Sequence, residues 1–249
     1  MKPLSRKQEK LIHSLKQKKF RDQHGLFLFE GKKLLDEAIH SEMEITSLLL
    51  ENPNEIDLDA TLPLSTVDSV LMKKLSNFKQ PPGILGVAKQ LKVKNIVPKK
   101  QELILMLDRI NDPGNLGTIL RNAAAFGVEH VICSENTVDC YNPKTVQSSM
   151  GAIFKSNVQY ANLSEWMIKH MGQVEIYAAD LSGENIYDCD WKFPAAVLLG
   201  SESHGISDAL LKLASRSVKI PIHPNTESLN VSSASAVFLA EVRRRLDDG

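Results

Sequence analysis

The sequence predicts a two-part α/β protein, and three observations support this fold class. Short apolar strands alternate with helical patterns along the whole chain. Residues 102–107, ELILML, form a near-continuous apolar run of the kind that a parallel sheet buries on both faces. Residues 89–101 are rich in lysine and contain a proline, which is typical of a linker. We therefore expect a small α/β module at residues 1–95 and a parallel-sheet domain at residues 96–249.

The first module is predicted to begin with a basic helix at residues 5–19, in which Leu11, Ile12 and Leu15 form a thin apolar stripe. Gly31 separates the first strand from the helix that follows it. The remaining expected order is a strand at 26–30, a helix at 32–40, a strand at 45–50, a helix at 67–75 and a strand at 83–88.

The second module is predicted to open with a βαβ unit, formed by a strand at 102–107, a helix at 116–126 and a strand at 128–133. Helices near 143–154 and 163–171, strands near 175–179 and 196–199, and a C-terminal amphipathic helix after Asn230 continue the alternation. Such an order favours a parallel sheet, whose strands present a ligand-binding edge at their carboxyl ends.

The charge of the chain is unevenly distributed, although the formal net charge is zero. Residues 1–100 hold 18 Lys and Arg against 12 Asp and Glu, and the remainder holds the reverse. Within the first 33 residues, ten basic side chains face three acidic ones. A local positive field of this kind attracts a polyanion such as RNA, and the alternative is a solvated helix face.

Several classes of protein are disfavoured by what the sequence lacks. No apolar run is long enough for a membrane helix and the first residues, MKPLSRKQEK, are too polar for a secretory signal, so we expect a soluble cytoplasmic protein without a membrane partner. The three cysteines show no CxxC spacing, which indicates neither a disulfide framework nor a metal site. No GxxxxGK[ST] or GxGxxG pattern is present, so a P-loop kinase or a dinucleotide dehydrogenase is disfavoured.

Three polar loops, each running from an apolar strand into a helix, are expected to form the binding site. In the first, at 107–121, Asn115 is expected to cap the helix, and Arg121 to project toward the same mouth. The alternative makes Arg121 a surface arginine and Asn115 only a cap. In the second, at 197–207, Gly200 ends the strand, Glu202 places a carboxylate at the loop tip and Gly205 turns the chain.

The third loop, at 220–232, leads into the C-terminal helix. Ser228 and Asn230 bracket the start of this helix, whose free amides are suited to a polar ligand group. The run at 232–236, SSASA, is unusually small, so we expect another element to pack very close to it.

The three loops resemble the three motifs of the SpoU (TrmH-like) family of RNA ribose 2′-O-methyltransferases, within the SPOUT superfamily. DPGNLGTILRNA at 112–123, LLGSESHGIS at 198–207 and IPIHPNTESLNVSSASA at 220–236 appear in the order of that family. The basic first module, residues 1–95, resembles the L30e-like RNA-binding domain that often precedes this catalytic domain.

The resemblance implies a fold, a cofactor and partners. It implies a deep trefoil knot in the C-terminal part of the parallel sheet, S-adenosylmethionine as cofactor, a homodimer, and structured RNA as substrate, with ribosomal RNA favoured. The cofactor-binding positions that it implies are Leu199, Gly200, Gly205, Ile220 and Leu229.

The resemblance also implies roles in methyl transfer to a ribose 2′-hydroxyl. Arg121 is expected to lower the pKa of that hydroxyl and to clamp the adjacent phosphate, because arginine almost never gives up its own proton. Asn115 and Glu202 would orient Arg121 and the ribose. Ser228 and Asn230 would shape the cofactor and nucleotide pocket.

Three alternatives remain open from the sequence. The substrate is tRNA rather than ribosomal RNA, or the methyl group goes to a base rather than to a ribose. In the third, the chain is a catalytically silent RNA-binding or ribosome-assembly factor. Ser203, Pro224 and Asn225 favour this last alternative, because they stand where members of the family commonly have glycine.

Overall fold

The computed structural model describes residues 4–53 and 62–248, which form two compact units. The first unit contains Met1–Lys92 together with Asp139–Phe154, and the second contains Val93–Val138 with Lys155–Gly249. The sequence had suggested a single division between residues 95 and 96, with 139–154 inside the second domain. No helix among the described residues is long and apolar enough to cross a membrane.

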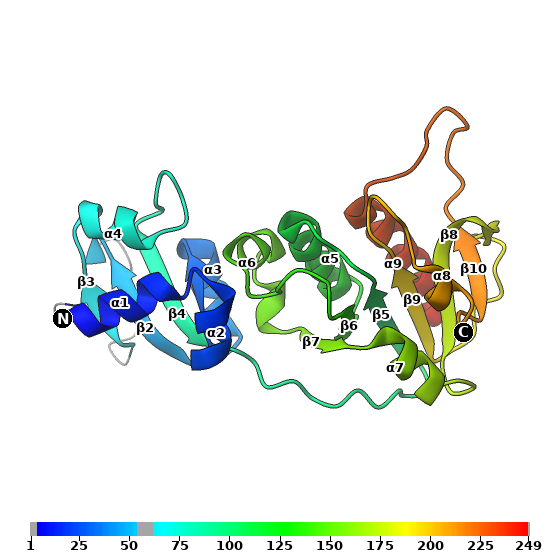
Figure 1. The fold of residues 1–249 in the computed structure, drawn as a ribbon, viewed down its shortest axis with the longest axis horizontal. Helices are drawn as coiled ribbons and strands as arrows, with labels where there is room; N and C mark the ends of the chain where they lie inside the picture. Colours follow the sequence, from blue (N-terminus) through cyan, green and yellow to red (C-terminus); the bar gives the residue numbers. More distant parts are fainter. Residues whose placement is uncertain (1–3, 54–61, 249) are drawn as a thin grey trace. The chain divides into compact units, whose positions relative to one another are not determined.

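The first unit is a small α/β domain built on a four-stranded sheet (Figure 1). In the sheet order β1-β4-β2-β3, β4 is antiparallel to both β1 and β2, and β3 is parallel to β2. Its elements are α1 (Arg6–Ser14), α2 (Lys18–His24), β1 (Leu26–Glu30), α3 (Lys32–His40), β2 (Ile45–Leu50), β3 (Leu64–Thr66), α4 (Ser69–Leu75), β4 (Ile84–Lys89), α6 (Pro143–Ser149) and the 3₁₀ turn η2 (Ala152–Phe154). The small α/β module predicted from the sequence is therefore confirmed.

The single helix expected at residues 5–19 is wrong, because the chain forms two helices there. Ser5 caps α1 in a capping box with Gln8, and α1 ends at Ser14. Leu15 then turns fully into the core. The carbonyl oxygens of Leu15 and Lys16 accept hydrogen bonds of 2.9 Å from the buried Arg21 guanidinium of α2.

A distant segment completes the core of the first unit. Phe27 and Phe29 of β1 pack against Phe154, at centroid distances of 6.1 and 5.9 Å, and Phe27 also lies 4.7 Å from Tyr141. The guanidinium of Arg21 donates to the Asp139 carboxylate, with an Nε to Oδ2 distance of 3.0 Å, and both side chains are buried. The one helix expected at 143–154 is broken, because Met150 and Gly151 adopt positive φ angles of 51° and 97°.

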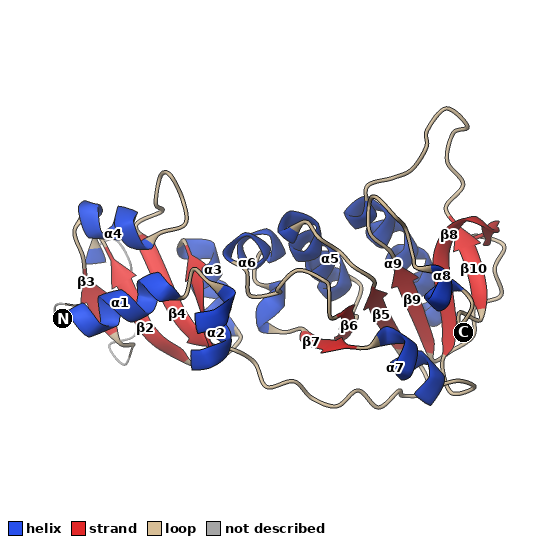
Figure 2. Cartoon of the chain, viewed as in Figure 1, coloured by secondary structure: helices blue, strands red, loops and turns tan. Residues whose placement is uncertain are grey.

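The second unit is built on a six-stranded sheet of order β10-β8-β9-β5-β6-β7 (Figure 2). All five neighbouring pairs are parallel, so the predicted parallel sheet is confirmed. Its elements are β5 (Leu103–Leu107), α5 (Pro113–Ala125), β6 (His130–Ser134), β7 (Asn157–Ala161), α7 (Leu163–Lys169), β8 (Glu175–Asn185), β9 (Ala195–Leu199), α8 (Asp208–Leu211), β10 (Arg216–Lys219) and α9 (Val231–Asp248). The strand β7 was not expected at its residues, whereas β10 stands where an apolar strand was expected to lead into the loop at 220–232.

The strands β5 and β9 are buried on both faces, as their apolar runs predicted. Alternate residues such as Ile104 and Met106 join a core cluster with Trp166 of α7 and Leu210 of α8. Helices α5 and α9 pack against each other, and α9 also contacts β9. The chain therefore returns from the edge strand β10 through a long loop and places α9 beside the middle of the sheet (Figure 1).

Candidate active site

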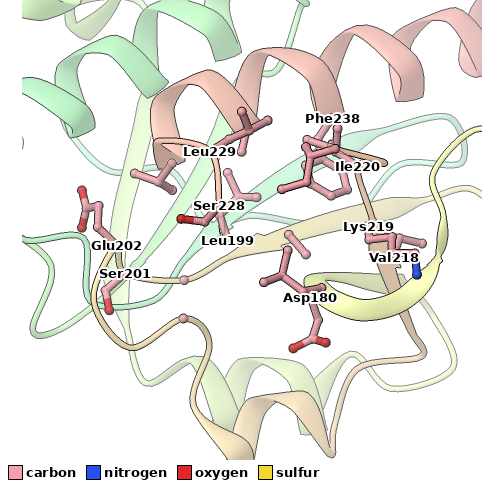
Figure 3. A pocket seen from close by; sticks show the side chains of 17 residues that line it. Asp180, Leu199, Ser201, Glu202, Val218, Lys219, Ile220, Ser228, Leu229 and Phe238 are labelled. Atoms are coloured by element: carbon pink, nitrogen blue, oxygen red, sulfur yellow. The ribbon is translucent and has the colours of Figure 1, made fainter. Parts of the chain in front are cut away.

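A pocket of about 260 Å³ lies at the carboxyl ends of β9 and β10, beside the middle of β8 and next to the start of α9. We call it the C-terminal pocket. Figure 3 shows Ser201 and Glu202 on one side and Asp180 and Lys219 on the other, with Phe238 of α9 above them. Its lining residues are Ala179, Asp180, Leu181, Leu199, Gly200, Ser201, Glu202, Gly205, Val218, Lys219, Ile220, Ile222, Ser228, Leu229, Val231, Ala234 and Phe238.

All five positions that the motif resemblance marked for the cofactor line this pocket, namely Leu199, Gly200, Gly205, Ile220 and Leu229. They meet because parallel strands bring the loops at their carboxyl ends to one edge of the sheet. Glu202 and Ser228 line the pocket as well.

Gly200 is required by a close approach of the loop that follows β9. A Cβ atom at Gly200 would lie 2.1 Å from the carbonyl carbon of Gly205 and 2.2 Å from the Ile206 nitrogen. The loop folds back in this way because Ser201 and Gly205 exchange two backbone hydrogen bonds, of 3.1 and 2.9 Å. Gly205 itself has a φ of 61°, which favours glycine. The wall of the pocket at this point is therefore bare peptide backbone.

Three polar side chains from the three loops form a connected cluster beside the pocket. The Asn115 side-chain amide donates to Glu202 Oε1, and Asn230 Nδ2 donates to Asn115 Oδ1 at 3.2 Å. Asn230 Oδ1 also accepts from the Ser232 nitrogen at 2.9 Å and so caps the start of α9.

The expectation that Asn115 caps α5 is wrong. Asp112 is the N-cap residue, and its carboxylate accepts from the Asn115 nitrogen at 2.9 Å. Asn115 consequently lies inside the first turn, where its side chain is free to reach Glu202 and Asn230. The sequence DPGN offered both Asp and Asn as caps, and Pro113 at the first helical position indicates Asp112.

Arg121 and Ser228 lie outside this cluster. Arg121 is exposed on α5, and among the described residues its guanidinium makes no hydrogen bond or ion pair. Asn122, the next residue, faces α9 instead: its Nδ2 donates to the Ser232 carbonyl oxygen at 2.8 Å and to Ser235 Oγ at 2.9 Å. The close packing expected at the small run 232–236 is thus confirmed, and the partner is α5.

Sequence reasoning missed several residues of the pocket, most clearly Asp180 and Lys219. Both lie near the edge of the sheet, where β8 is longer than expected and β10 pairs with it across a register shift at Ser217 and Val218. Glycine at 183 was a usable signal, since a Cβ there would lie 2.4 Å from the Val218 nitrogen. No group of three or more His, Cys, Asp or Glu within the described part of the chain is arranged to hold a metal ion.

The first unit carries a second hollow, of about 650 Å³, which we call the lysine hollow. Its lining residues are Glu51, Ser69, Val70, Lys73, Lys74, Lys79, Gln80 and Pro81. The buried Glu30 carboxylate fixes the adjoining loop, because it accepts hydrogen bonds from Ser76 Oγ (2.5 Å) and from the Asn77 nitrogen (2.9 Å). Lys16 Nζ donates to the Ser76 carbonyl oxygen, and burial lowers the pKa of Lys16 while the Glu30 charge opposes this shift.

Each of the two parts of the chain matches a known protein family. The SpoU rRNA Methylase family matches residues 102–240, and the MRM3-like substrate binding domain matches residues 7–86. An uncharacterized tRNA/rRNA methyltransferase of Synechocystis is 32% identical over 95% of this chain and 90% of its own length. The 23S rRNA (guanosine(2553)-2′-O)-methyltransferase RlmP of Bacillus subtilis is 29% identical over 91% of this chain and 92% of its own.

Solved structures agree with these matches over nearly the whole chain. The AdoMet-bound rRNA methyltransferase of Sinorhizobium meliloti superposes with a TM-score of 0.86 and 29% identity, covering 99% of this chain and 97% of that protein. A putative RNA methyltransferase of the TrmH family from Porphyromonas gingivalis also gives a TM-score of 0.86, at 29% identity over 98% of this chain.

Proposed function

Because the chain belongs to the SpoU rRNA methylase family, we propose that it transfers a methyl group from S-adenosylmethionine to a ribose 2′-hydroxyl of ribosomal RNA. The observation that carries this proposal is the joining of Asn115, Glu202 and Asn230, one from each loop, at the edge of the C-terminal pocket. RNA methylation is the activity in the names of the relatives, and S-adenosylmethionine is the cofactor of the family.

The lining of the C-terminal pocket fits this cofactor. Val218, Ile220, Leu229 and Phe238 offer apolar surface for a flat ring, and the bare backbone near Gly200 offers amide and carbonyl groups to its polar edge. Asp180 and Glu202 supply negative charge, which suits a cationic sulfonium. When bound, S-adenosylmethionine supplies an activated methyl group.

The protein side chains then have to position the ribose and stabilise the negative charge that develops on its 2′-oxygen. Asn115 is held from two sides, by Glu202 and by Asn230, so its amide is preorganised at the mouth of the pocket. Ser228 borders the same mouth. We assign to these four residues the binding and orientation of the nucleotide.

Arg121 is proposed to meet the RNA itself. Its guanidinium is exposed and free of partners among the described residues, so a phosphate does not have to displace an internal ion pair. A guanidinium beside the ribose lowers the pKa of the 2′-hydroxyl and clamps a phosphate through two parallel N–H groups. Arg121 thus favours loss of the hydroxyl proton without itself acting as the base.

The first unit is proposed to bind the RNA substrate through the lysine hollow. Lys73, Lys74 and Lys79 line one surface of that unit, and ammonium groups attract the phosphate backbone without reading its sequence. The match to a substrate binding domain over residues 7–86 supports this division of labour.

Further expectations from the sequence enter here as proposals. A homodimer is supported by Leu181 and Leu229, which line the C-terminal pocket yet are 62% and 38% exposed. A trefoil knot is supported by the return of α9 from the edge strand β10 to α5 and β9. The cytoplasm is proposed because Cys133, Cys140 and Cys189 are all buried and show no CxxC spacing, which suits a reducing compartment.

The test is transfer of labelled methyl from S-adenosylmethionine to total RNA, followed by alkaline hydrolysis of the product. Label in alkali-resistant dinucleotides of ribosomal RNA is the expected result. Label in tRNA would mean that the substrate is tRNA instead of ribosomal RNA, and label only in free mononucleotides would mean base methylation. RNA binding with no transfer and no cofactor binding would identify a silent RNA-binding factor and overturn the proposal.

A further inference from the structure

Arg109 is a residue to which neither the motifs nor the proposed mechanism gives a role. It follows β5 and the buried Asp108, and it is not glycine although its φ is 57°, in the left-handed region. Its backbone is fixed on one side, since the Arg109 nitrogen donates to Ser134 Oγ at 2.8 Å at the end of β6. When a residue other than glycine keeps an unfavourable backbone conformation, we expect its side chain to make contacts that offset the cost.

Those contacts reach the loop at 200–207, which forms one wall of the C-terminal pocket. The Arg109 guanidinium donates to Asp108 Oδ2, at 3.2 Å from Nε and 3.1 Å from Nη2. Nη2 also lies 3.4 Å from the carbonyl oxygen of Gly205. Asp108 Oδ2 in turn accepts from the Ser207 nitrogen at 3.0 Å.

Asp108 and Arg109 thus hold this loop near its second end, at Gly205 and Ser207. The same Gly205 carbonyl oxygen accepts from the Ser201 nitrogen at 3.1 Å, so the contact of Arg109 adds to the bond that closes the turn. Glu202, at the tip of that turn, is the residue that Asn115 contacts. A chain of contacts therefore runs from Arg109 to the pocket wall and to the polar cluster.

We propose that Arg109 is a positioning residue, which holds the loop at 200–207 in the conformation that binds S-adenosylmethionine. The inference rests on the proposed function, because it assumes that the C-terminal pocket is the cofactor site. Arg109 acts through Asp108 and Gly205. Its guanidinium pairs with the Asp108 carboxylate, whose side chain is only 6% exposed and which also accepts the hydrogen bond from the Ser207 nitrogen. The guanidinium also donates to the Gly205 carbonyl oxygen.

The test uses Arg109→Gly, which removes the guanidinium and suits the left-handed backbone. Glu42→Gly is the matched control, because Glu42 also has a positive φ, of 53°, but is exposed and lies in the first unit. Hydrogen exchange of the Gly205 and Ser207 amides in the cofactor-free protein is the first readout. We expect exchange about tenfold faster in Arg109→Gly and unchanged exchange in Glu42→Gly.

Calorimetry and kinetics supply the second readout. In Arg109→Gly, the Kd and KM for S-adenosylmethionine should rise roughly tenfold, while kcat at saturating cofactor and RNA changes less than about threefold. Arg109→Lys, which keeps the charge but not the two-point geometry, should fall between the wild type and Arg109→Gly.

Two results would overturn the proposal. One is wild-type cofactor affinity and wild-type amide exchange in Arg109→Gly. The other is an unchanged cofactor Kd with a raised KM for RNA, which would make the guanidinium an RNA contact. A wild-type protein that does not bind S-adenosylmethionine would refute the proposed function instead, and the amide exchange would still decide whether Arg109 holds the loop.

Discussion

The C-terminal pocket is shaped by backbone contacts, whereas the lysine hollow is supported by side chains that reach buried groups. In the second unit, Gly200 and Gly205 touch through main-chain atoms, and the loop closes through two main-chain hydrogen bonds. In the first unit, the buried Glu30 carboxylate fixes the loop beside Lys79, and a distant segment with Asp139 and Phe154 completes the core. A pocket walled by backbone suits one small ligand, and a surface that carries several lysines suits a large polyanion.

This contrast predicts that damage to the buried ion pair of the first unit leaves the pocket of the second intact. Asp139→Asn keeps the side-chain volume but leaves the buried Arg21 guanidinium without its anion. We expect local destabilisation of about 3–5 kcal/mol, seen as faster hydrogen exchange in α2 and β1. Cofactor affinity should change less than about twofold, because independent sites contribute separately.

The matched control for this variant is Asp22→Asn. Asp22 pairs with Lys18 at 2.7 Å, but its side chain is 52% exposed. An exposed pair of this kind contributes about 0.5 kcal/mol or less. Equal exchange in the two variants would contradict the structural role of the buried ion pair, and a large loss of cofactor affinity in Asp139→Asn would contradict the proposed independence of the two units.

A second prediction concerns Arg121, the exposed arginine of α5. Arg121→Ala should lower kcat roughly 10²–10³-fold, the usual effect of removing one group that stabilises developing negative charge. The calorimetric Kd for S-adenosylmethionine should stay unchanged, because Arg121 does not line the C-terminal pocket. Arg6→Ala, at an exposed arginine of α1, is the control. Near-normal turnover of Arg121→Ala with saturating RNA and cofactor would remove Arg121 from the mechanism.

A third prediction uses two glycines that are crowded for different reasons. A Cβ at Gly200 would meet backbone 2.1 Å away, and a Cβ at Gly86 would meet the Phe29 ring at 2.0 Å. Overpacking costs about 1–3 kcal/mol, so Gly200→Ala should weaken cofactor binding roughly 10–100-fold in calorimetry. Gly86→Ala should lower the melting temperature of the first unit and leave the cofactor Kd unchanged. Cofactor binding lost equally in both variants would show that the two regions are not separate.

The same contrast explains how far the sequence predicted each unit. The five positions predicted for the cofactor line one pocket, because strand ends and glycines are local signals and parallel pairing then fixes their place. The family match confirms the resemblance that three motifs in order had indicated. Asn115 was misread as a cap because Asp112, three residues earlier, offered the same chemistry.

In the first unit, strands and helices at 26–50 were predicted with their observed bounds, but the packing was not. The break after Ser14 is stabilised by Arg21, whose partner Asp139 is 118 residues away. No local periodicity records such a pair. The strand β3 has three residues, too few for a two-residue alternation to be recognised.

The smallest predicted effect is on RNA affinity, through the lysines of the hollow. The double variant Lys73→Gln and Lys79→Gln removes two exposed charges without touching the buried groups that hold the loop. We expect RNA to bind about 3–10-fold more weakly near physiological salt, with a lower slope of log K against log salt.

The matched control for net charge is Lys169→Gln with Lys212→Gln, at two exposed lysines of the second unit. Since phosphate contacts carry no sequence information, the loss should be uniform across RNA sequences, and kcat at saturating RNA should not change. An equal loss in the control pair would mean that overall charge, rather than the lysine hollow, attracts the RNA. A changed kcat with unchanged RNA affinity would instead assign these lysines to the chemistry and contradict the proposed division of labour between the two units.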